Sequence, residues 1–103
     1  MADPIRIRAQ LKDNTADVRT LVSHPMETGV RKDNAGQLVP AHYITNYEAS
    51  LNGRVVLSGK WGVAVSQNPF VWFRLTDCKA GDKVSVRWLD NKGDTRTDEI
   101  VLA

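Results

Sequence analysis

The feature of this sequence that most constrains its fold is an alternation of apolar and polar residues with a period of two, broken at short intervals by turn-forming residues. The clearest stretch covers residues 4–12, where isoleucine, alanine and leucine alternate with arginine, glutamine and lysine. A period of two places the apolar side chains on one face of a β-strand. No stretch of eleven or more residues carries an apolar stripe at helical spacing, so the sequence predicts strands and short turns.

The sequence predicts about seven or eight strands. Residues 43–51 and 54–58 flank Asn52 and Gly53, which tolerate the positive φ angles of a type I′ turn, so we expect a β-hairpin there. Further strands are expected near residues 17–23, 70–75, 84–88 and 95–102. We expect Phe73 and Trp88 to be the largest core side chains. Strands of this number and spacing are typical of an antiparallel, all-β sandwich.

Length and composition predict a single domain that spans residues 1–103. Hydrophobic residues make up 42% of the chain and charged residues 25%, as in an ordinary globular domain. The net charge is only +2, so we expect no nucleic-acid partner. The longest stretches without charged residues have 13 residues, too few to span a membrane, and the N-terminus shows no signal peptide. A single cysteine, Cys78, excludes an intrachain disulfide.

Two groups of residues are candidates for chemistry. Cys78 lies beside Lys79, and a neighbouring cation favours a reactive thiolate, but no histidine is close in sequence to serve as its base. His24 and His42 would be metal ligands if the loop between them folded back, with a third ligand from Met26, Glu27 or Asp33. Since no known ligand spacing is present, we favour an incidental thiol and two loop histidines that form local hydrogen bonds.

Two further features suggest an interaction surface. Residues 26–40 form a long loop rich in charged residues, glycine and proline, and ordered loops of this length are often functional. Trp72 falls on the strand face opposite Val71 and Phe73, beside Arg74. An outward tryptophan beside an arginine is typical of an interface anchor, although Trp72 would be a core residue if the strand faces were reversed.

Several blocks of the sequence, in order, resemble the Z subunit of the SoxYZ sulfur carrier. They are VRTLVSHPMETG at residues 18–29, PAHYI at 40–44, NG at 52–53, WG at 61–62, VSQNPF at 65–70 and VRWLDNKG at 86–93. The blocks extend through almost the whole chain, and HPMETG is the most distinctive of them.

This resemblance implies an immunoglobulin-like β-sandwich and a non-catalytic role without a cofactor. In the SoxZ family the Z subunit pairs with a Y subunit as a heterodimer or a higher assembly, and a cysteine on the C-terminal arm of the Y subunit carries the sulfur intermediates of thiosulfate oxidation. Other enzymes of the pathway act on that arm transiently. The family also implies a periplasmic protein exported as a complex with the Y subunit, whose signal it uses.

The residues expected to bind the partner come from the matched loop blocks and from the outward strand face. They are His24, Met26, Glu27 and His42, with Asn68, Pro69 and Trp72 as weaker candidates. Two alternatives remain open. One is a thiol- or metal-dependent sulfur-handling enzyme that uses Cys78 with His24 or His42, and the other is a generic immunoglobulin-like adhesion or chaperone module.

Overall fold

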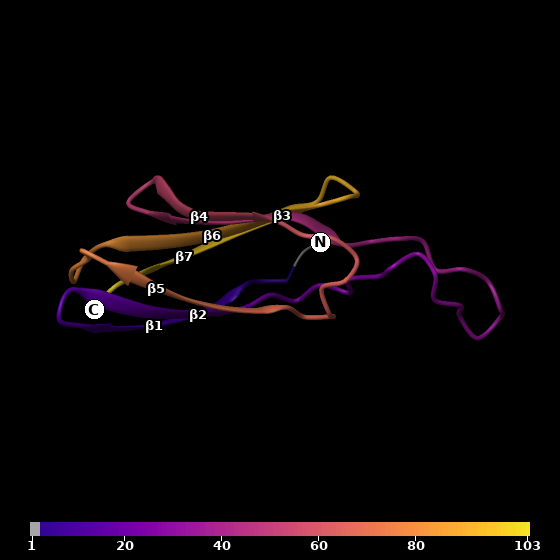
Figure 1. Cartoon of the computed structure of the whole chain (residues 1–103), viewed down its shortest axis with the longest axis horizontal. Helices are drawn as coiled ribbons and strands as arrows, with labels where there is room; N and C mark the ends of the chain where they lie inside the picture. Colours follow the sequence, from indigo (N-terminus) through magenta and orange to yellow (C-terminus); the bar gives the residue numbers. More distant parts are fainter. Residues whose placement is uncertain (1–2) are drawn as a thin grey trace.

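The computed structural model describes residues 3–103, which form two stacked antiparallel sheets (Figure 1). The strands are β1 (Arg6–Lys12), β2 (Thr15–Leu21), β3 (Ile44–Leu51), β4 (Arg54–Lys60), β5 (Phe70–Thr76), β6 (Lys83–Asp90) and β7 (Thr95–Val101). No helix is present in this part of the chain, and therefore none that is long and apolar enough to cross a membrane.

The two sheets have the order β1-β2-β5 and β4-β3-β6-β7, and every strand pair is antiparallel. The chain crosses between the sheets after β2, β4 and β5, whereas β1 and β2, β3 and β4, and β6 and β7 are hairpins within one sheet. Strand β1 approaches β7 at one side of the sandwich. This is the antiparallel β-sandwich that the strand pattern predicts, of the immunoglobulin-like type that the family resemblance implies, with seven strands.

The tight turns follow from residues that tolerate positive φ. Asn52 and Gly53 have φ angles of 52° and 84° and connect β3 to β4, which confirms the hairpin. Asp13 and Asn14 connect β1 to β2 in the same way, with φ angles of 52° and 62°, although the sequence pattern did not predict this second hairpin turn. Asparagine and aspartate adopt this conformation more readily than other residues with a Cβ atom.

The hydrophobic core lies between the two sheets and consists of the inward-facing side chains of the alternating strands. Trp88 is 2% exposed, as predicted, whereas Phe73 packs against the core but stays partly exposed. One buried polar pair crosses the core, because the Thr20 hydroxyl lies 2.7 Å from the Tyr47 hydroxyl. Burial raises the pKa of Tyr47, and the hydrogen bond to Thr20 opposes that rise.

The outer face of the β1-β2-β5 sheet carries an unusual set of side chains. Three large apolar residues are exposed there: Leu21 is 39% exposed, Phe70 59% and Trp72 56%. Leu21 and Phe70 are directly opposite in the register of β2 and β5. Of the two placements that the sequence left open for Trp72, the outward one is correct. We call these three residues the apolar strip.

The connection from β2 to β3 is a long loop that projects beyond one end of the sandwich, in purple to magenta in Figure 1. Two isolated β-bridges, Glu27 to His42 and Lys32 to Leu38, hold its two arms together. At the tip, the Asp33 carboxylate accepts hydrogen bonds from the backbone of Ala35 and Gln37. The expected loop over residues 26–40 is therefore present and locally ordered.

Candidate functional site

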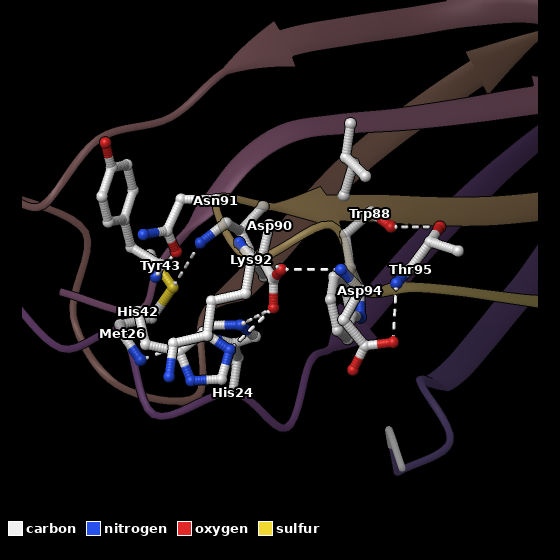
Figure 2. A network of polar contacts seen from close by, with 12 residues as sticks. His24, Met26, His42, Tyr43, Trp88, Asp90, Asn91, Lys92, Asp94 and Thr95 are labelled. Carbon is white, nitrogen blue, oxygen red and sulfur yellow. Dashed lines mark hydrogen bonds and ion pairs between the residues drawn. The ribbon is translucent and has the colours of Figure 1, made fainter. Parts of the chain in front are cut away.

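The candidate site is a polar network at the end of the sandwich from which the long loop projects, and Asp90 is its centre (Figure 2). Asp90 ends β6, and its side chain is completely buried. Its Oδ2 atom lies 3.0 Å from His24 Nε2 and 2.8 Å from His42 Nε2. Its Oδ1 atom accepts backbone hydrogen bonds from Lys92 at 3.0 Å and Asp94 at 2.9 Å.

These contacts decide the charge of Asp90. Burial acts to raise the pKa of this carboxyl, but the hydrogen bonds from His24, His42 and the backbone of Asp94 and Lys92 outweigh it. The net effect is a pKa below the ordinary value, so Asp90 is ionised at neutral pH. One buried carboxylate therefore closes the β6–β7 turn and also attaches the long loop to the sheet.

His24 is fixed in one neutral form. The backbone N–H of Met26 donates to His24 Nδ1 at 3.1 Å, so this nitrogen carries no proton. The proton of the neutral ring is then on Nε2, which donates to Asp90. With its side chain 2% exposed and its ring in edge contact with Trp88, His24 has no access to solvent.

His42 occupies a different position in the same network. Its Nε2 faces Asp90, its side chain is 27% exposed, and its ring meets that of His24 edge to face at 4.6 Å between centroids. The backbone of His42 exchanges two hydrogen bonds with Glu27, at 2.6 and 3.0 Å. Among residues 3–103, His42 Nδ1 has no hydrogen-bond partner, and it is not among the buried unpaired atoms.

The three side chains bring their nitrogen and oxygen atoms within 4.8 Å of one another, which is compact enough to consider a metal ion. A neutral histidine that binds a metal through Nε2 carries its proton on Nδ1 and donates it to an acceptor. In this structure His24 Nδ1 already accepts the N–H of Met26, so Nδ1 cannot carry the proton that a metal-bound histidine would need there. The donor set therefore does not fit a metal ion.

The structure also corrects the expected partners of the two histidines. Met26, Glu27 and Asp33 were the expected third ligands, but the group that meets both rings is Asp90. The expected local hydrogen bonds describe only part of the network: His24 Nδ1 does accept from Met26, two residues away, but both Nε2 atoms bond to Asp90, which lies 66 residues from His24 in sequence. The segment of residues 90–94 was predicted only as a turn, and nothing in its sequence pointed to a histidine partner.

Six of the seven expected partner-binding residues lie together at this end of the sandwich. His24 and Asn68 exchange two hydrogen bonds of 3.0 Å, and the Pro69 carbonyl accepts from Val22. His24 and Met26 are buried within this chain, at 4% and 5% exposure, and Pro69 is also buried. The accessible members of the group are Glu27, His42 and Asn68.

Met26 connects the network to the core through a strained backbone. Its φ angle is 48°, a conformation that costs a residue with a Cβ atom roughly 1 kcal/mol. This conformation aims its N–H at His24 Nδ1, while its buried sulfur accepts a hydrogen bond from the backbone of Ile44. The strained residue therefore helps to fix the neutral form of His24.

Trp72, the seventh residue, lies on the outer face of the β1-β2-β5 sheet. The guanidinium of Arg19 lies over its ring at 4.7 Å, and its indole N–H donates to the Asp17 carboxylate. Both contacts come from β2, the strand paired with β5. They hold the exposed indole in one orientation.

Cys78 is buried at 2% exposure, with its Sγ atom against the backbone carbonyls of Asn14 and Leu75. It packs in the cluster that contains Val84 at the start of β6, whereas Asp90 and the histidines are at the end of that strand. Six residues of β-strand separate these points by about 20 Å. A pair between Cys78 and either histidine is not formed.

Comparison with known proteins agrees with this arrangement of strands and loops. The family model for the sulphur oxidation protein SoxZ matches residues 5–101, nearly the whole chain. The chain belongs to the SoxZ family. It is therefore a subunit of the Sox system of sulfur oxidation, as the resemblance of its sequence blocks implied.

Other comparisons of this SoxZ-family chain support the fold alone. No curated protein matches it. A crystal structure of superoxide reductase in the oxidised state is similar over 96% of this chain and 86% of the other, with a TM-score of 0.66 and 18% sequence identity. At that identity the similarity establishes a shared β-sandwich, and it says nothing about chemistry.

Proposed function

We propose that this chain is the non-catalytic partner subunit of the SoxYZ sulfur carrier. In this role it pairs with a Y subunit whose C-terminal cysteine carries the sulfur intermediates, and other Sox enzymes contact the pair transiently. The observation that carries the proposal is the apolar strip on the outer face of the β1-β2-β5 sheet. A two-layer sandwich does not need large apolar side chains on an outer face.

The strip has the properties of an anchor for a permanent partner. Trp72 is held by Arg19 and Asp17, so a partner that covers it does not have to order a mobile indole. Tryptophan and arginine dominate the energetics of protein interfaces. Leu21 and Phe70 extend the same apolar surface across two strands.

Charge on this face indicates what kind of surface the partner presents. The outer side chains of the three strands include five exposed cations and one carboxylate: Arg6, Arg8, Lys12, Arg19 and Arg74, with Asp17. The whole chain has a net charge of only +2, so cationic charge is concentrated here. We therefore expect the facing surface of the Y subunit to be apolar at its centre and acidic at its rim.

The test is a binding measurement with the purified Y subunit. Trp72→Asp should weaken the heterodimer by at least about 30-fold, since truncation of an anchor typically costs about 2 kcal/mol or more. Val101→Asp, on β7, is the matched control because Val101 is 59% exposed and Trp72 is 56% exposed. Unchanged affinity in Trp72→Asp would remove this face from the interface.

Two details of the proposal have independent tests. Met26→Asp should also weaken pairing, in this case by disrupting the buried contact of Met26 with Ile44 at the start of β3 rather than by changing the surface. We also propose a periplasmic location, reached as a folded complex with the Y subunit, as membership of the SoxZ family suggests. Fractionation of cells with and without the Y subunit tests the location directly. Export of this chain in cells that lack the Y subunit would contradict the proposal.

A further inference from the structure

His42 differs from His24 in having a ring nitrogen that is available for reaction. His42 Nε2 lies 2.8 Å from the Asp90 carboxylate. Asp90 is ionised and can only accept a hydrogen bond, so Nε2 is the ring nitrogen that carries the proton. Nδ1 then carries a lone pair. That atom has no partner within residues 3–103, and the side chain is 27% exposed.

The surroundings of His42 hold this arrangement in place. Asp90 receives three further N–H donors, so it cannot rotate away without losing them. The backbone bridge to Glu27 fixes the position of His42, and the Glu27 side chain is engaged with Arg31 at 3.0 Å. The charged or titratable groups around His42 are thus Asp90, His24 and the Glu27–Arg31 pair.

A buried carboxylate that binds one nitrogen of an imidazole and leaves the other to solvent is the arrangement of an acid–base histidine. The carboxylate fixes the tautomer and stabilises the imidazolium that forms when the free nitrogen accepts a proton. Among the described residues, no side chain donates a proton to His42 Nδ1, and the thiol of Cys78 is buried far away. Nδ1 is therefore open to solvent and to a proton donor on another molecule.

We propose that His42 Nδ1 is a surface base that accepts the proton of a cysteine thiol presented by the partner subunit. This inference depends on the pairing with a Y subunit proposed above. In the step, the S–H bond breaks and the sulfur keeps the electron pair as a thiolate. The proton forms an N–H bond at Nδ1, and the resulting imidazolium of His42 pairs with the carboxylate of Asp90.

The location of His42 suits this role. Asn68 and Glu27, two accessible residues from the matched sequence blocks, lie at the same end of the sandwich, beside the root of the projecting loop. The apolar strip lies on the outer face of the β1-β2-β5 sheet, so stable pairing and contact with the partner's cysteine use different side chains of this chain. Asp90 is a positioning residue in this arrangement, since it acts on the thiol only through His42.

The test measures alkylation of the partner cysteine by iodoacetamide in the purified complex, followed by intact mass from pH 6 to 9. His42→Gln retains a side-chain N–H for Asp90 but has no basic nitrogen. A free thiol is only a few per cent thiolate at pH 7, and lowering its pKa by one unit raises that fraction about eight-fold. We expect alkylation at pH 7 to be about five-fold slower in His42→Gln, with the rate profile shifted toward higher pH. Gln67→Ala is the control, because Gln67 is exposed and directly precedes Asn68 in sequence.

The outcomes separate this proposal from the pairing proposal. An intact His42→Gln complex with an unchanged rate profile would overturn the role of His42 and leave the pairing intact. If the wild-type chains do not associate, both proposals fail. If His42→Gln prevents assembly, a second measurement tests the proposal on the wild-type chain. The His42 Cε1–H resonance is titrated by NMR in two complexes, one with the native partner and one with a partner whose cysteine is replaced by serine, and the two titration curves should differ. Identical curves would overturn the proposal.

Discussion

Asp90→Asn is the substitution that most directly tests the polar network, because it preserves shape and removes one acceptor. The amide oxygen can still accept from the backbone of Lys92 and Asp94. The amide nitrogen, however, now faces the Nε2–H groups of His24 and His42, which are both donors. His24 cannot invert its tautomer, since its Nδ1 already accepts from the backbone, whereas the exposed Nδ1 of His42 lets that ring adapt at a smaller cost.

The expected loss of stability can be estimated from these contacts. His24 is buried, so its unpaired N–H costs about 1–3 kcal/mol. His42 is partly exposed and water can replace its lost bond, which leaves a cost of about 1 kcal/mol. The free energy of unfolding should therefore fall by about 3 kcal/mol, and Tm by about 15 °C for a domain of this size. Urea unfolding followed by tryptophan fluorescence measures this.

The pH dependence distinguishes a lost carboxylate from a general packing defect. The pKa of Asp90 is lower in the folded protein than in the unfolded chain. The contribution of the ionised carboxylate to the free energy of unfolding is therefore complete at pH values above the unfolded-state pKa, and it is lost as the pH falls through the folded-state pKa. The gap in stability between wild type and Asp90→Asn should thus be full at pH 7 and shrink toward pH 3. Asp94→Asn is the control, because Asp94 is exposed. A gap below 1 kcal/mol at pH 7, or one independent of pH, would refute the reasoning.

Two further substitutions test other parts of the structure. Gly29→Ala should lower the free energy of unfolding by about 1 kcal/mol more than Gly36→Ala does. Both glycines have a positive φ angle, but only at Gly29 would a Cβ atom meet another atom, the Ala41 Cβ at 3.1 Å. Equal unfolding midpoints for the two variants would show that the loop adjusts at no cost. Cys78→Ser should leave thiosulfate turnover by the assembled pathway unchanged, because the thiol is buried against backbone carbonyls; loss of turnover in a folded complex would restore Cys78 as a reactive group.

The strands were predictable because they depend on local pattern. Alternation of apolar and polar residues assigns the faces of β1, β5 and β6 without further information. Asn52 and Gly53 specified their hairpin by backbone preference alone. The turn at Asp13 and Asn14 was missed because aspartate and asparagine also occur in many other surface contexts.

The network could not be predicted, because its members are joined only by the fold. Asp90 lies 48 residues from His42 in sequence and follows an ordinary strand into an ordinary turn, so its pattern predicts nothing beyond that turn. The antiparallel pairing of β3 with β6 brings Ile44 opposite Asp90 and so carries His42, two residues earlier, to the carboxylate. Only the register of two distant strands contains this information, and no local rule specifies it.

The unequal exposure of the two histidines also explains why the network includes both. A single His42–Asp90 pair would leave part of a buried carboxylate without donors, and an unsatisfied buried charge is strongly destabilising. His24 supplies the missing donor from inside the protein, and the strained backbone of Met26 prevents it from accepting a second proton at Nδ1. Proton exchange with a partner is thereby confined to His42. It follows that Met26→Gly, which relieves the backbone strain but opens a cavity, should affect stability far more than the pH profile of thiol alkylation.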